Sequence, residues 1–276
     1  MGTLYVVATP IGNLEEMSPR AIAILKAVSL IAAEDTRHSA ILARTFGIET
    51  PMVSYHQHNR KSREDQLLQA LAGGDVAVIS DAGTPGIADP GRDVVEAAHR
   101  AGHRVVPISG PSAMAAAVSA SGLVEGPFIF LGFLPRTGED RRAQLAKAKA
   151  VAWPIVIFES PMRLAETLAE FAQVFGDRPA IVARELSKLH EEIIPGTLVA
   201  LAERFAEWEP RGEIVIVVGA DAEPAEAEID VRAVIRSLLD QGMKPSKVAR
   251  EAASMASLPG SEVYELVREI QREREH

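Results

Sequence analysis

The sequence contains no cysteine. This absence excludes disulfide bonds, a thiol nucleophile and metal sites built on thiolates, and it makes a reducing cytoplasm the expected compartment. No run of 18 apolar residues is free of charge, so the sequence predicts no membrane span. The opening stretch, MGTLYVVATP, has no basic residue ahead of its apolar segment, and we therefore expect no signal peptide.

Basic residues are also fewer than acidic ones. The chain has 29 Lys and Arg against 38 Asp and Glu, a net charge of −9. This argues against non-specific nucleic-acid binding by the whole surface and leaves local basic patches open. Two phosphate-binding signatures are missing as well. No GxGxxG follows the first predicted strand, and neither GxxxxGKS nor GxxxxGKT occurs, so the sequence indicates neither a dinucleotide-binding fold nor a P-loop.

Strand-like runs and helix-like segments alternate along most of the chain. The predicted strands are residues 4–9, 29–34, 76–80, 104–109, 128–132, 154–159, 180–185 and 213–219. Several are apolar throughout, as expected of parallel strands that are covered on both faces. Helix starts are clear where Ser18 precedes Pro19 and Ser160 precedes Pro161, because each pair places an N-cap serine before a proline. The alternation predicts an α/β fold.

Small, turn-rich residues at 119–127 suggest a boundary between two α/β units. We therefore expect an N-terminal α/β domain over 1–123 and a second over 126–220. An acidic stretch rich in Ala and Pro reads as a linker, and residues 228–276 are expected to form a small helical, helix-turn-helix-like module. From residue 226 onward there are 8 Lys and Arg against 10 Asp and Glu. That balance favours packing or dimer support over the reading of a nucleic-acid groove, and both stay open.

Four loops rich in Gly, Pro and polar residues each follow a predicted strand: 9–13, 34–39, 80–91 and 109–113. Ligands bind at the carboxyl ends of strands in open α/β sheets, so we expect these loops to meet at one sheet edge, although each alone is also compatible with simple turn chemistry. The acidic loop at 80–91 would repel phosphate, whereas Asp81 and Asp89 suit hydroxyls, amines or a cation. An adenine nucleoside with a sulfonium and an amino-acid tail offers all three. This favours S-adenosylmethionine over NAD or ATP.

The motifs spread over residues 4–219 carry a resemblance to a known family. The most specific combination is EDTRHS, SDAGTP and ARELSK, accompanied in order by LYVVATPIGNL, HQHN, ISGPSA, GFLPR, FESPMRL and RGEIVIVV. Together they resemble the tetrapyrrole methylase superfamily, the class III methyltransferases. Within it the chain is most similar to the branch that methylates ribose 2′-hydroxyls of small-subunit ribosomal RNA. Ser109 departs from the proline expected in many relatives, without putting a role in doubt.

That resemblance implies two α/β domains with S-adenosylmethionine bound in the cleft between them, in a homodimer. It also implies the substrate, which is the 2′-hydroxyl of a cytidine in the decoding region of 16S rRNA, presented on an assembled small subunit. An acidic enzyme fits such a target, because shape and a few local contacts would select it. The helical tail resembles the C-terminal module of that branch less specifically.

The resemblance further implies which residues bind the cofactor. Ser112 and Ala113 match positions that contact its methionine part, although Ser112 is also a candidate N-cap, and the two roles are compatible. Phe158, Ala183 and Ile214 are expected to close over the adenine. With Asp81 from the acidic loop, the full set is Pro10, Gly12, Asp81, Gly83, Thr84, Pro85, Ile87, Ser112, Ala113, Phe158, Ala183 and Ile214.

Methyl transfer needs aligned reactants, exclusion of water and a group that handles the proton of a weakly acidic hydroxyl. Glu34 and Asp35 offer adjacent carboxylates beside Arg37, and His56 offers a base with a pKa of about 6.5. Lys188 could stabilise a developing alkoxide. We predict a shared network of these five residues and single out no base among them.

Simpler interpretations of the same residues stay open. Residues 34–37 could form a salt-bridged turn with Asp35 or Thr36 as a helix N-cap. Glu34, His56 and His58 could form a metal site, but this kind of methyl transfer needs no metal, and we expect none.

Two basic stretches are candidates for gripping RNA phosphates, and each is equally compatible with a solvated helix face. The candidates are Arg60, Lys61, Arg63, Arg136, Arg141 and Arg142.

Two other functions compete with RNA methylation. One is a precorrin-type tetrapyrrole methylase of the same fold. The other is a ribosome-assembly module that binds the cofactor without turnover.

Overall fold

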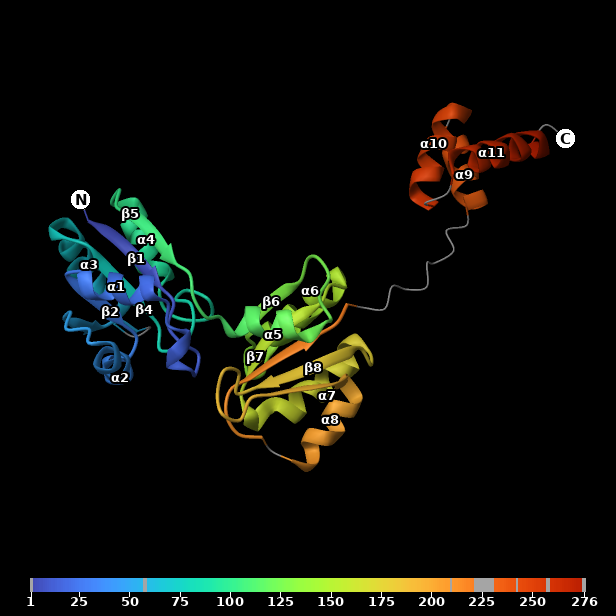
Figure 1. Cartoon of the computed structure of the whole chain (residues 1–276). Helices are drawn as coiled ribbons and strands as arrows, with labels where there is room; N and C mark the ends of the chain where they lie inside the picture. Colours follow the sequence, from blue (N-terminus) through green and yellow to red (C-terminus); the bar gives the residue numbers. More distant parts are fainter. Residues whose placement is uncertain are drawn as a thin grey trace. The chain divides into compact units, whose positions relative to one another are not determined.

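The computed structural model describes residues 2–56, 59–208, 210–220, 231–241, 243–256 and 259–274, except for the side chains of residues 60, 61, 233, 254–256, 273 and 274. The chain divides into two compact units, Met1–Asp221 and Ala222–His276. The first unit holds two β-sheets with helices packed on them, and the second is helical in its described part (Figure 1). The predicted fold class is confirmed.

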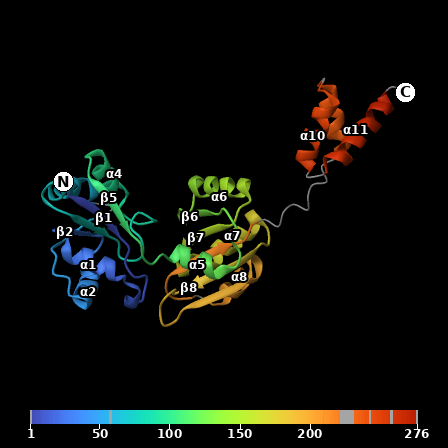
Figure 2. The same cartoon turned by 45° about the horizontal axis from the view of Figure 1, so that its top comes forward.

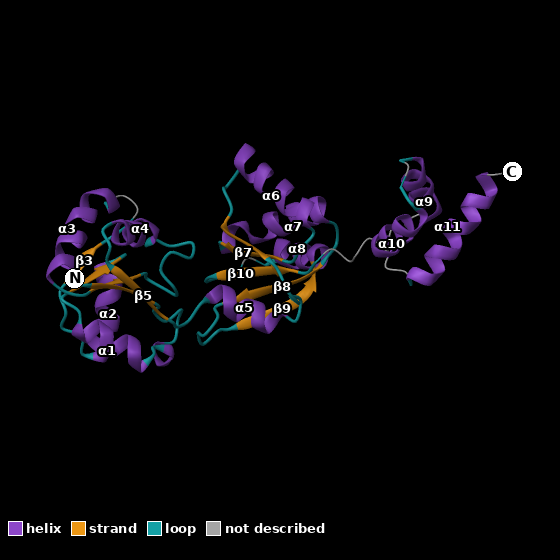
Figure 3. Ribbon diagram, turned by 90° about the horizontal axis from the view of Figure 1, so that it is seen from above, coloured by secondary structure: helices purple, strands orange, loops and turns teal. Residues whose placement is uncertain are grey.

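The first sheet and its helices come from the N-terminal part of the chain. Its elements are β1 (Thr3–Val7), η1 (Leu14–Glu16), α1 (Pro19–Ala27), β2 (Leu30–Ala33), α2 (Thr36–Phe46), β3 (Met52–Ser54), α3 (Arg60–Gly73), β4 (Val76–Ile79), α4 (Arg92–Arg100) and β5 (Arg104–Ile108). All strands are parallel, in the order β3-β2-β4-β1-β5. Helices α1 and α2 pack on one face and α3 and α4 on the other (Figure 3). Central strand β4 is therefore buried at every residue.

The sequence signal for the start of α1 is confirmed in detail. The Ser18 hydroxyl accepts a hydrogen bond from the backbone N–H of Ala21 at 3.1 Å, and Pro19 occupies the first helical position. The side-chain oxygen satisfies one of the N–H groups that a helix start leaves without a partner. The second Ser-Pro pair behaves differently, because Pro161 opens a short 3-10 turn before the next helix begins.

The second sheet follows helix α5 (Ala113–Ser121). Its elements are β6 (Ile129–Phe133), α6 (Glu139–Val151), β7 (Ile155–Glu159), η2 (Pro161–Arg163), α7 (Leu164–Phe175), β8 (Pro179–Arg184), β9 (Glu192–Thr197), α8 (Leu198–Glu207) and β10 (Ile214–Val218). The strand order is β6-β7-β10-β8-β9. Only β6 and β7 pair in parallel, whereas β10 runs antiparallel to both β7 and β8, and β8 runs antiparallel to β9.

The expectation of parallel strands is therefore wrong for most of the second sheet. Its inner strands β7, β10 and β8 are largely apolar because helices cover both faces, irrespective of strand direction. Helices α6, α7 and α8 pack on one face and α5 on the other (Figure 3). Strand β10 is consequently buried at all five residues.

Two strands escaped the sequence prediction, and both lie at sheet edges. Strand β3 has only three residues, too few to show a pattern. Strand β9 contains Pro195 and Gly196, which argue against a strand in sequence. Proline is tolerated there because β9 pairs only with β8 and leaves its other side unpaired within the described sheet.

The C-terminal unit contains α9 (Val231–Asp240), α10 (Pro245–Ala256) and α11 (Gly260–Arg274). These helices share an apolar core of their own, in which Ile235, Val248, Val263 and Val267 have no exposed surface. Helices α10 and α11 lie side by side (Figure 2). The predicted helical module is thus present, while the division of the first unit into domains over 1–123 and 126–220 stays a prediction.

Candidate functional site

The four loops singled out in the sequence meet at the carboxyl edge of the first sheet. Thr9 and Gly83 exchange two backbone hydrogen bonds, with N–O distances of 2.8 and 3.1 Å, and so join the first loop to the acidic one. The Thr84 hydroxyl donates to the Pro111 carbonyl at 3.2 Å and joins the acidic loop to the last one. The expectation that these loops converge is confirmed, because parallel pairing brings all the strand ends to one side.

The remaining loop, which begins with Glu34, is tied to the acidic loop by two carboxylates. The Asp35 N–H donates to the Asp81 carboxylate at 3.0 Å, and the Asp81 N–H donates to the Glu34 carboxylate at 3.3 Å. Burial and the neighbouring charge of Asp81 raise the pKa of Glu34, although the hydrogen bond from the Asp81 backbone opposes the rise. Glu34 and Asp81 thus hold the loops in register.

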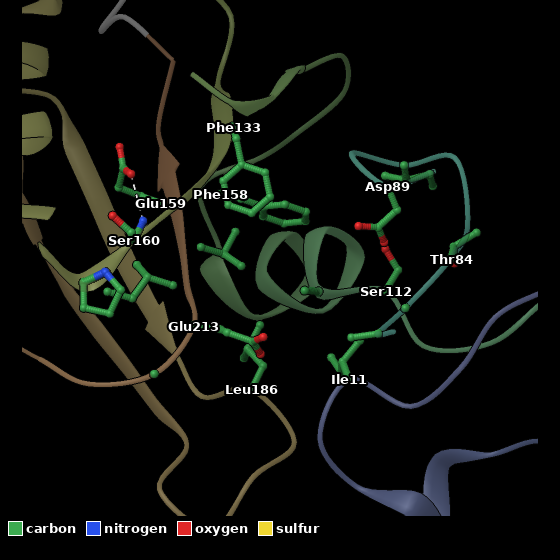
Figure 4. A pocket seen from close by; sticks show the side chains of 18 residues that line it. Ile11, Thr84, Asp89, Ser112, Phe133, Phe158, Glu159, Ser160, Leu186 and Glu213 are labelled. Atoms are coloured by element: carbon green, nitrogen blue, oxygen red, sulfur yellow. Dashed lines mark hydrogen bonds between the residues drawn. The ribbon is translucent and has the colours of Figure 1, made fainter. Parts of the chain in front are cut away.

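A cavity of about 330 Å³ opens beside these loops. Figure 4 shows Ile11, Thr84, Asp89 and Ser112 on one side of it and aromatic Phe133 and Phe158 on another. The lining residues are Ile11, Ala82, Gly83, Thr84, Ile87, Asp89, Ser112, Ala113, Phe133, Phe158, Glu159, Ser160, Pro161, Leu186, Gly212, Glu213, Ile214 and Val215. Both sheets contribute to the wall, as predicted for a cofactor cleft.

Antiparallel pairing explains why the second sheet presents the end of one strand and the start of another to this cavity. In the register of β7 and β10, Glu159 is opposite Ile214 and Phe158 is opposite Val215. The last residues of β7 and the first residues of β10 therefore share one edge. Strand β8 ends at that edge too, since Arg184 is opposite Ile214 on the other side.

The cavity is acidic. Its described lining includes Asp89, Glu213 and the buried Glu159, and neither lysine nor arginine. Burial and the nearby charges of Glu34, Asp81 and Glu213 raise the pKa of Asp89 to about 7, although a hydrogen bond with Ser80 opposes the rise. Such a wall disfavours phosphate and favours a cationic ligand.

Glu159 is the most buried of these acids, with a side chain only 1% exposed. It accepts hydrogen bonds from the Ser160 N–H at 2.8 Å and the Thr167 hydroxyl at 2.7 Å, and it pairs with the Arg163 guanidinium at 3.2 Å. These contacts satisfy the carboxylate, so its role is to fix the turn after β7.

Helix α5 begins at the cavity wall. Ser112 occupies its N-cap position, but its hydroxyl makes no capping hydrogen bond. The hydroxyl and the first N–H groups of the helix lie where Ser112 and Ala113 line the cavity. A carboxylate bound there would meet the positive end of the helix.

Seven of the twelve residues predicted to bind the cofactor line this cavity. They are Gly83, Thr84, Ile87, Ser112, Ala113, Phe158 and Ile214. Four of them lie in the loops that follow strands of the first sheet. Of the other three, Ala113 begins α5, and Phe158 and Ile214 belong to the second sheet.

The other five lie elsewhere. Pro10, Gly12 and Asp81 line another cavity, of about 220 Å³, to which residues of α2 also contribute. Pro85 packs near Gly91 within the acidic loop. Ala183 was expected to close over the adenine, and this is wrong for its side chain, which is fully buried between β10 and α5.

Four of the five predicted catalytic residues gather at the ends of β2 and β3. Asp35 caps α2 by accepting from the Arg37 N–H at 2.8 Å, and it pairs with the Arg37 guanidinium at 2.7 Å. Hydrogen bonds from Arg37 hold the pKa of Asp35 well below its usual range. The simpler interpretation of residues 34–37, a salt-bridged helix start, is therefore present in the structure. His56 lies close enough to Glu34 for their charges to interact.

The fifth candidate, Lys188, follows β8 of the second sheet. Its amine donates to Glu185 at 2.7 Å and to Glu213 at 2.9 Å. Burial alone would lower the pKa of this amine, but those hydrogen bonds outweigh burial and raise it. Its stem packs directly against Gly12, where a Cβ atom would collide with it. Lys188 thus stays protonated, and none of the five catalytic candidates lines the main cavity.

The predicted RNA contacts divide into different environments. Arg136 and Arg142 are exposed around a surface cavity of about 440 Å³. Arg141 is only 6% exposed and donates to Glu170, Thr167 and the Pro135 carbonyl. Its assignment to RNA is therefore corrected to a structural role. Arg63 is half-buried on α3, and the side chains of Arg60 and Lys61 lie outside the described residues.

Several lining residues were not assigned a role from the sequence, although a signal was present for each. Phe133, Leu186 and Glu213 lie inside GFLPR, ARELSK and RGEIVIVV, three motifs that carried the family resemblance. Asp89 was noted as suited to a hydroxyl or a cation but was left out of the site. Residues inside a matched motif that end or begin a buried strand are the ones to test first.

Among the described residues, no helix is both long and apolar enough to span a bilayer. Within the same residues, no three His, Asp or Glu side chains converge to form a metal site. His58, part of the alternative metal site, lies outside the described residues.

The sequence was compared with those of known proteins. The family model for Tetrapyrrole (Corrin/Porphyrin) Methylases matches residues 3–202. Three similar proteins are each named ribosomal RNA small subunit methyltransferase I. The one from Synechocystis sp. is 44% identical over 98% of this chain and 99% of its own. Those from Pseudomonas aeruginosa and Bacillus subtilis are 44% and 40% identical, over 94% and 96% of this chain and 93% and 94% of their own.

Solved structures share the fold at low sequence identity. Uroporphyrin-III C-methyltransferase from Thermus thermophilus, in complex with S-adenyl homocysteine, has a TM-score of 0.57 at 19% identity, covering 79% of this chain and 97% of its own. The cobalamin biosynthetic enzyme cobalt precorrin-4 methyltransferase has a TM-score of 0.61 at 17% identity, covering 79% and 94%.

Proposed function

The chain is a member of the tetrapyrrole methylase family, and from that premise we propose that it methylates ribosomal RNA of the small subunit with S-adenosylmethionine as donor. The observation that carries the proposal is the 40–44% identity, over nearly the full length of both chains, to proteins named ribosomal RNA small subunit methyltransferase I. In its finer form, the acceptor is the 2′-hydroxyl of a cytidine in the decoding region of 16S rRNA, on an assembled subunit in the cytoplasm.

The charge of the main cavity supports this donor. Asp89 and Glu213 line it, and no basic side chain does so among the described residues. A sulfonium is attracted to such a wall, whereas the pyrophosphate of a dinucleotide would be repelled. In this proposal the methionine carboxylate binds at the start of α5, beside Ser112 and Ala113, and the adenine packs against Phe158 and Ile214, all of which line the cavity.

The same charge weighs against a tetrapyrrole substrate. A macrocycle with several carboxylates would have to approach Asp89, whose charge no lysine or arginine among the described lining residues offsets. The other two acids of the wall are already paired, Glu159 with Arg163 and Glu213 with Lys188. The structural likeness to tetrapyrrole methylases therefore supports the fold and not their substrate.

For the chemistry, the protein must hold the donor methyl in line with the acceptor oxygen and manage one proton. The sulfonium is already a good leaving group. In this proposal Glu34, Asp35, Arg37 and His56 order the acceptor side, and Lys188, which carries a positive charge, stabilises negative charge that develops on the acceptor oxygen.

RNA contact is proposed for Arg60, Lys61, Arg63, Arg136 and Arg142. Arg136 and Arg142 are exposed, as phosphate contacts must be. An acidic chain with few local cations would depend on the shape of an assembled subunit for selection, and a homodimer would present two such surfaces.

The test uses donor labelled in its methyl group. The full chain is incubated with unmethylated small subunits, with deproteinised rRNA and with a precorrin. Label in subunit RNA that resists alkaline cleavage at one cytidine supports the proposal. Label only in the macrocycle identifies a tetrapyrrole methylase, and donor binding without transfer to any acceptor identifies a binding module; either result refutes the proposal.

A further inference from the structure

Another cavity adjoins the main cavity, the proposed donor site, at the acidic loop; we call it the second cavity. It measures about 350 Å³ and is lined by Tyr55, Gly86, Ala88, Asp89, Pro90, Gly91, Arg92 and Asp93. Its volume falls in the range of small-molecule sites. Among the described residues Asp89 alone lines both cavities. A carboxylate on a shared wall can reach ligands on both sides.

The backbone beside Asp89 is in an uncommon conformation. Ala88 has φ of +61°, in the left-handed region that is unfavourable for a residue with a Cβ. Its methyl group packs towards Gly132 of the second sheet, at 3.5 Å from where a Cβ of that residue would lie. The uncommon conformation immediately precedes Asp89, the residue that lines both cavities.

The second cavity also contains a cation. Arg92 is exposed at the first position of α4, and the N-cap residue before it, Gly91, offers no side chain to cap that helix. An anionic group at the mouth of this cavity would meet both the guanidinium and the start of the helix. The carboxylate of Asp89, shared with the first cavity, and the exposed cation of Arg92 match a nucleotide that presents its hydroxyl to Asp89 and a phosphate to Arg92.

We infer that the second cavity receives the acceptor nucleotide, that Asp89 takes the proton of its hydroxyl, and that Arg92 contacts an adjacent phosphate. This rests on the proposed function. As the acceptor oxygen attacks, the O–CH₃ bond forms and the bond between sulfur and methyl breaks. The sulfur keeps that electron pair and becomes a neutral thioether, and the acceptor proton passes to the Asp89 carboxylate. Glu34 then acts as a positioning residue, through its charge near Asp89.

The electrostatics of Asp89 suit this role. The charged groups that face it are Glu34 at the end of β2, Asp81 in its own loop and Glu213 before β10. Burial and these charges raise the pKa of Asp89 to about 7, where a carboxylate is a much better base than in water. Asp93 and Arg92 line the same cavity on α4. The rate of the chemical step should fall as pH decreases through about 7.

The experiment compares Asp89→Asn with Glu96→Gln, which changes an exposed carboxylate on α4 outside both cavities. Methyl transfer to small subunits is measured in single turnover from about pH 6 to 9, and affinity for S-adenosylhomocysteine by calorimetry. Asp89→Asn should lose about 10²- to 10⁴-fold in rate and keep its affinity for S-adenosylhomocysteine, which lacks the sulfonium charge, within threefold, while Glu96→Gln behaves as wild type. Arg92→Ala should raise the KM for subunits with kcat unchanged and lower the salt slope by about one.

Several outcomes would overturn the inference. One is a rate within threefold of wild type for Asp89→Asn, and another is a parallel loss of affinity for S-adenosylhomocysteine, which would make Asp89 a ligand of the nucleoside rather than the base. If Asp89→Asn fails to fold, a wild-type rate that is flat from about pH 6 to 8, or an unchanged KM in Arg92→Ala, would do the same. Failure of the proposed function is distinct, since wild-type protein would then transfer no methyl group to subunits at all.

Discussion

Replacing Gly83 by alanine tests whether the conformation of the acidic loop determines donor binding. Gly83 has φ of +80°, a conformation open to glycine and strained for alanine. Its backbone exchanges two hydrogen bonds with Thr9, so it cannot rotate freely. A Cβ at this position would lie 3.4 Å from the Ile11 side chain, which also lines the donor cavity.

The expected cost follows from two opposing effects. Alanine in the left-handed region costs roughly 1–2 kcal/mol. Alanine also restricts the unfolded chain more than glycine does, which returns about 0.4–1 kcal/mol. The net loss is about 1 kcal/mol, or about 2–4 °C in thermal midpoint for a unit of 221 residues. The acidic loop of the ligand-free variant could instead relax to escape the strain. Donor binding would then have to restore the strained loop conformation, and the same energy would appear as about a fivefold weaker affinity.

The assay therefore measures both quantities on one variant, the thermal midpoint by calorimetry and the affinity for S-adenosylhomocysteine by titration. The matched control is Gly73→Ala at the exposed end of α3. Gly73 has no atom within 4 Å of its would-be Cβ and lacks a left-handed φ, so alanine there should be neutral or stabilising. Were Gly83→Ala to equal Gly73→Ala in both measurements, the loop conformation would carry no strain relevant to binding.

Three other predictions address individual side chains. Lys188→Met should reduce methyl transfer at least 10²-fold with donor affinity within a few-fold, whereas Lys147→Met should not, and near-normal turnover would remove Lys188 from the chemistry. Asp35→Asn should lower the thermal midpoint near pH 7. Because the folded pKa of Asp35 is depressed, its stabilisation is fully present above the ordinary value of 3.8, so the difference between the two proteins should shrink below that pH and vanish only below the folded pKa. Arg63→Glu should weaken subunit binding and reduce its salt dependence by about one unit of slope, and an unchanged slope would place Arg63 away from RNA.

The local chemistry of the first sheet was readable from the sequence because its signals are local. A serine before a proline marks the start of α1, and glycine and proline after apolar runs mark the loops that now prove to be hydrogen-bonded to one another. Strand direction in the second sheet was not readable in this way. Buried strands look alike in sequence whether parallel or antiparallel, since burial on both faces sets their composition, as β10 demonstrates.

The burial and contacts of individual side chains at the site were harder to predict from the sequence. Arg141 and Arg142 are adjacent and chemically identical, yet one is buried against Glu170 and Thr167 and the other is exposed. The difference depends on which face of α6 meets α7, and charge counting along the chain does not contain that information. Ala183 fails for a related reason, because a matched motif locates a strand end but not the depth of each side chain.

The acidic loop unites the two functional inferences. Its glycines let the backbone form hydrogen bonds with Thr9 and approach a ligand closely. Its two aspartates, Asp81 and Asp89, have different roles because their partners differ. Asp81 is occupied by the Asp35 N–H and holds the loops together, while Asp89 lies on a wall between two cavities, crowded by like charges. Exchanging Asp81 for asparagine should therefore loosen the loops and also lower the pKa of Asp89, because one of its repelling charges is lost. A loop that only bound a cation would need neither the second cavity nor this crowding.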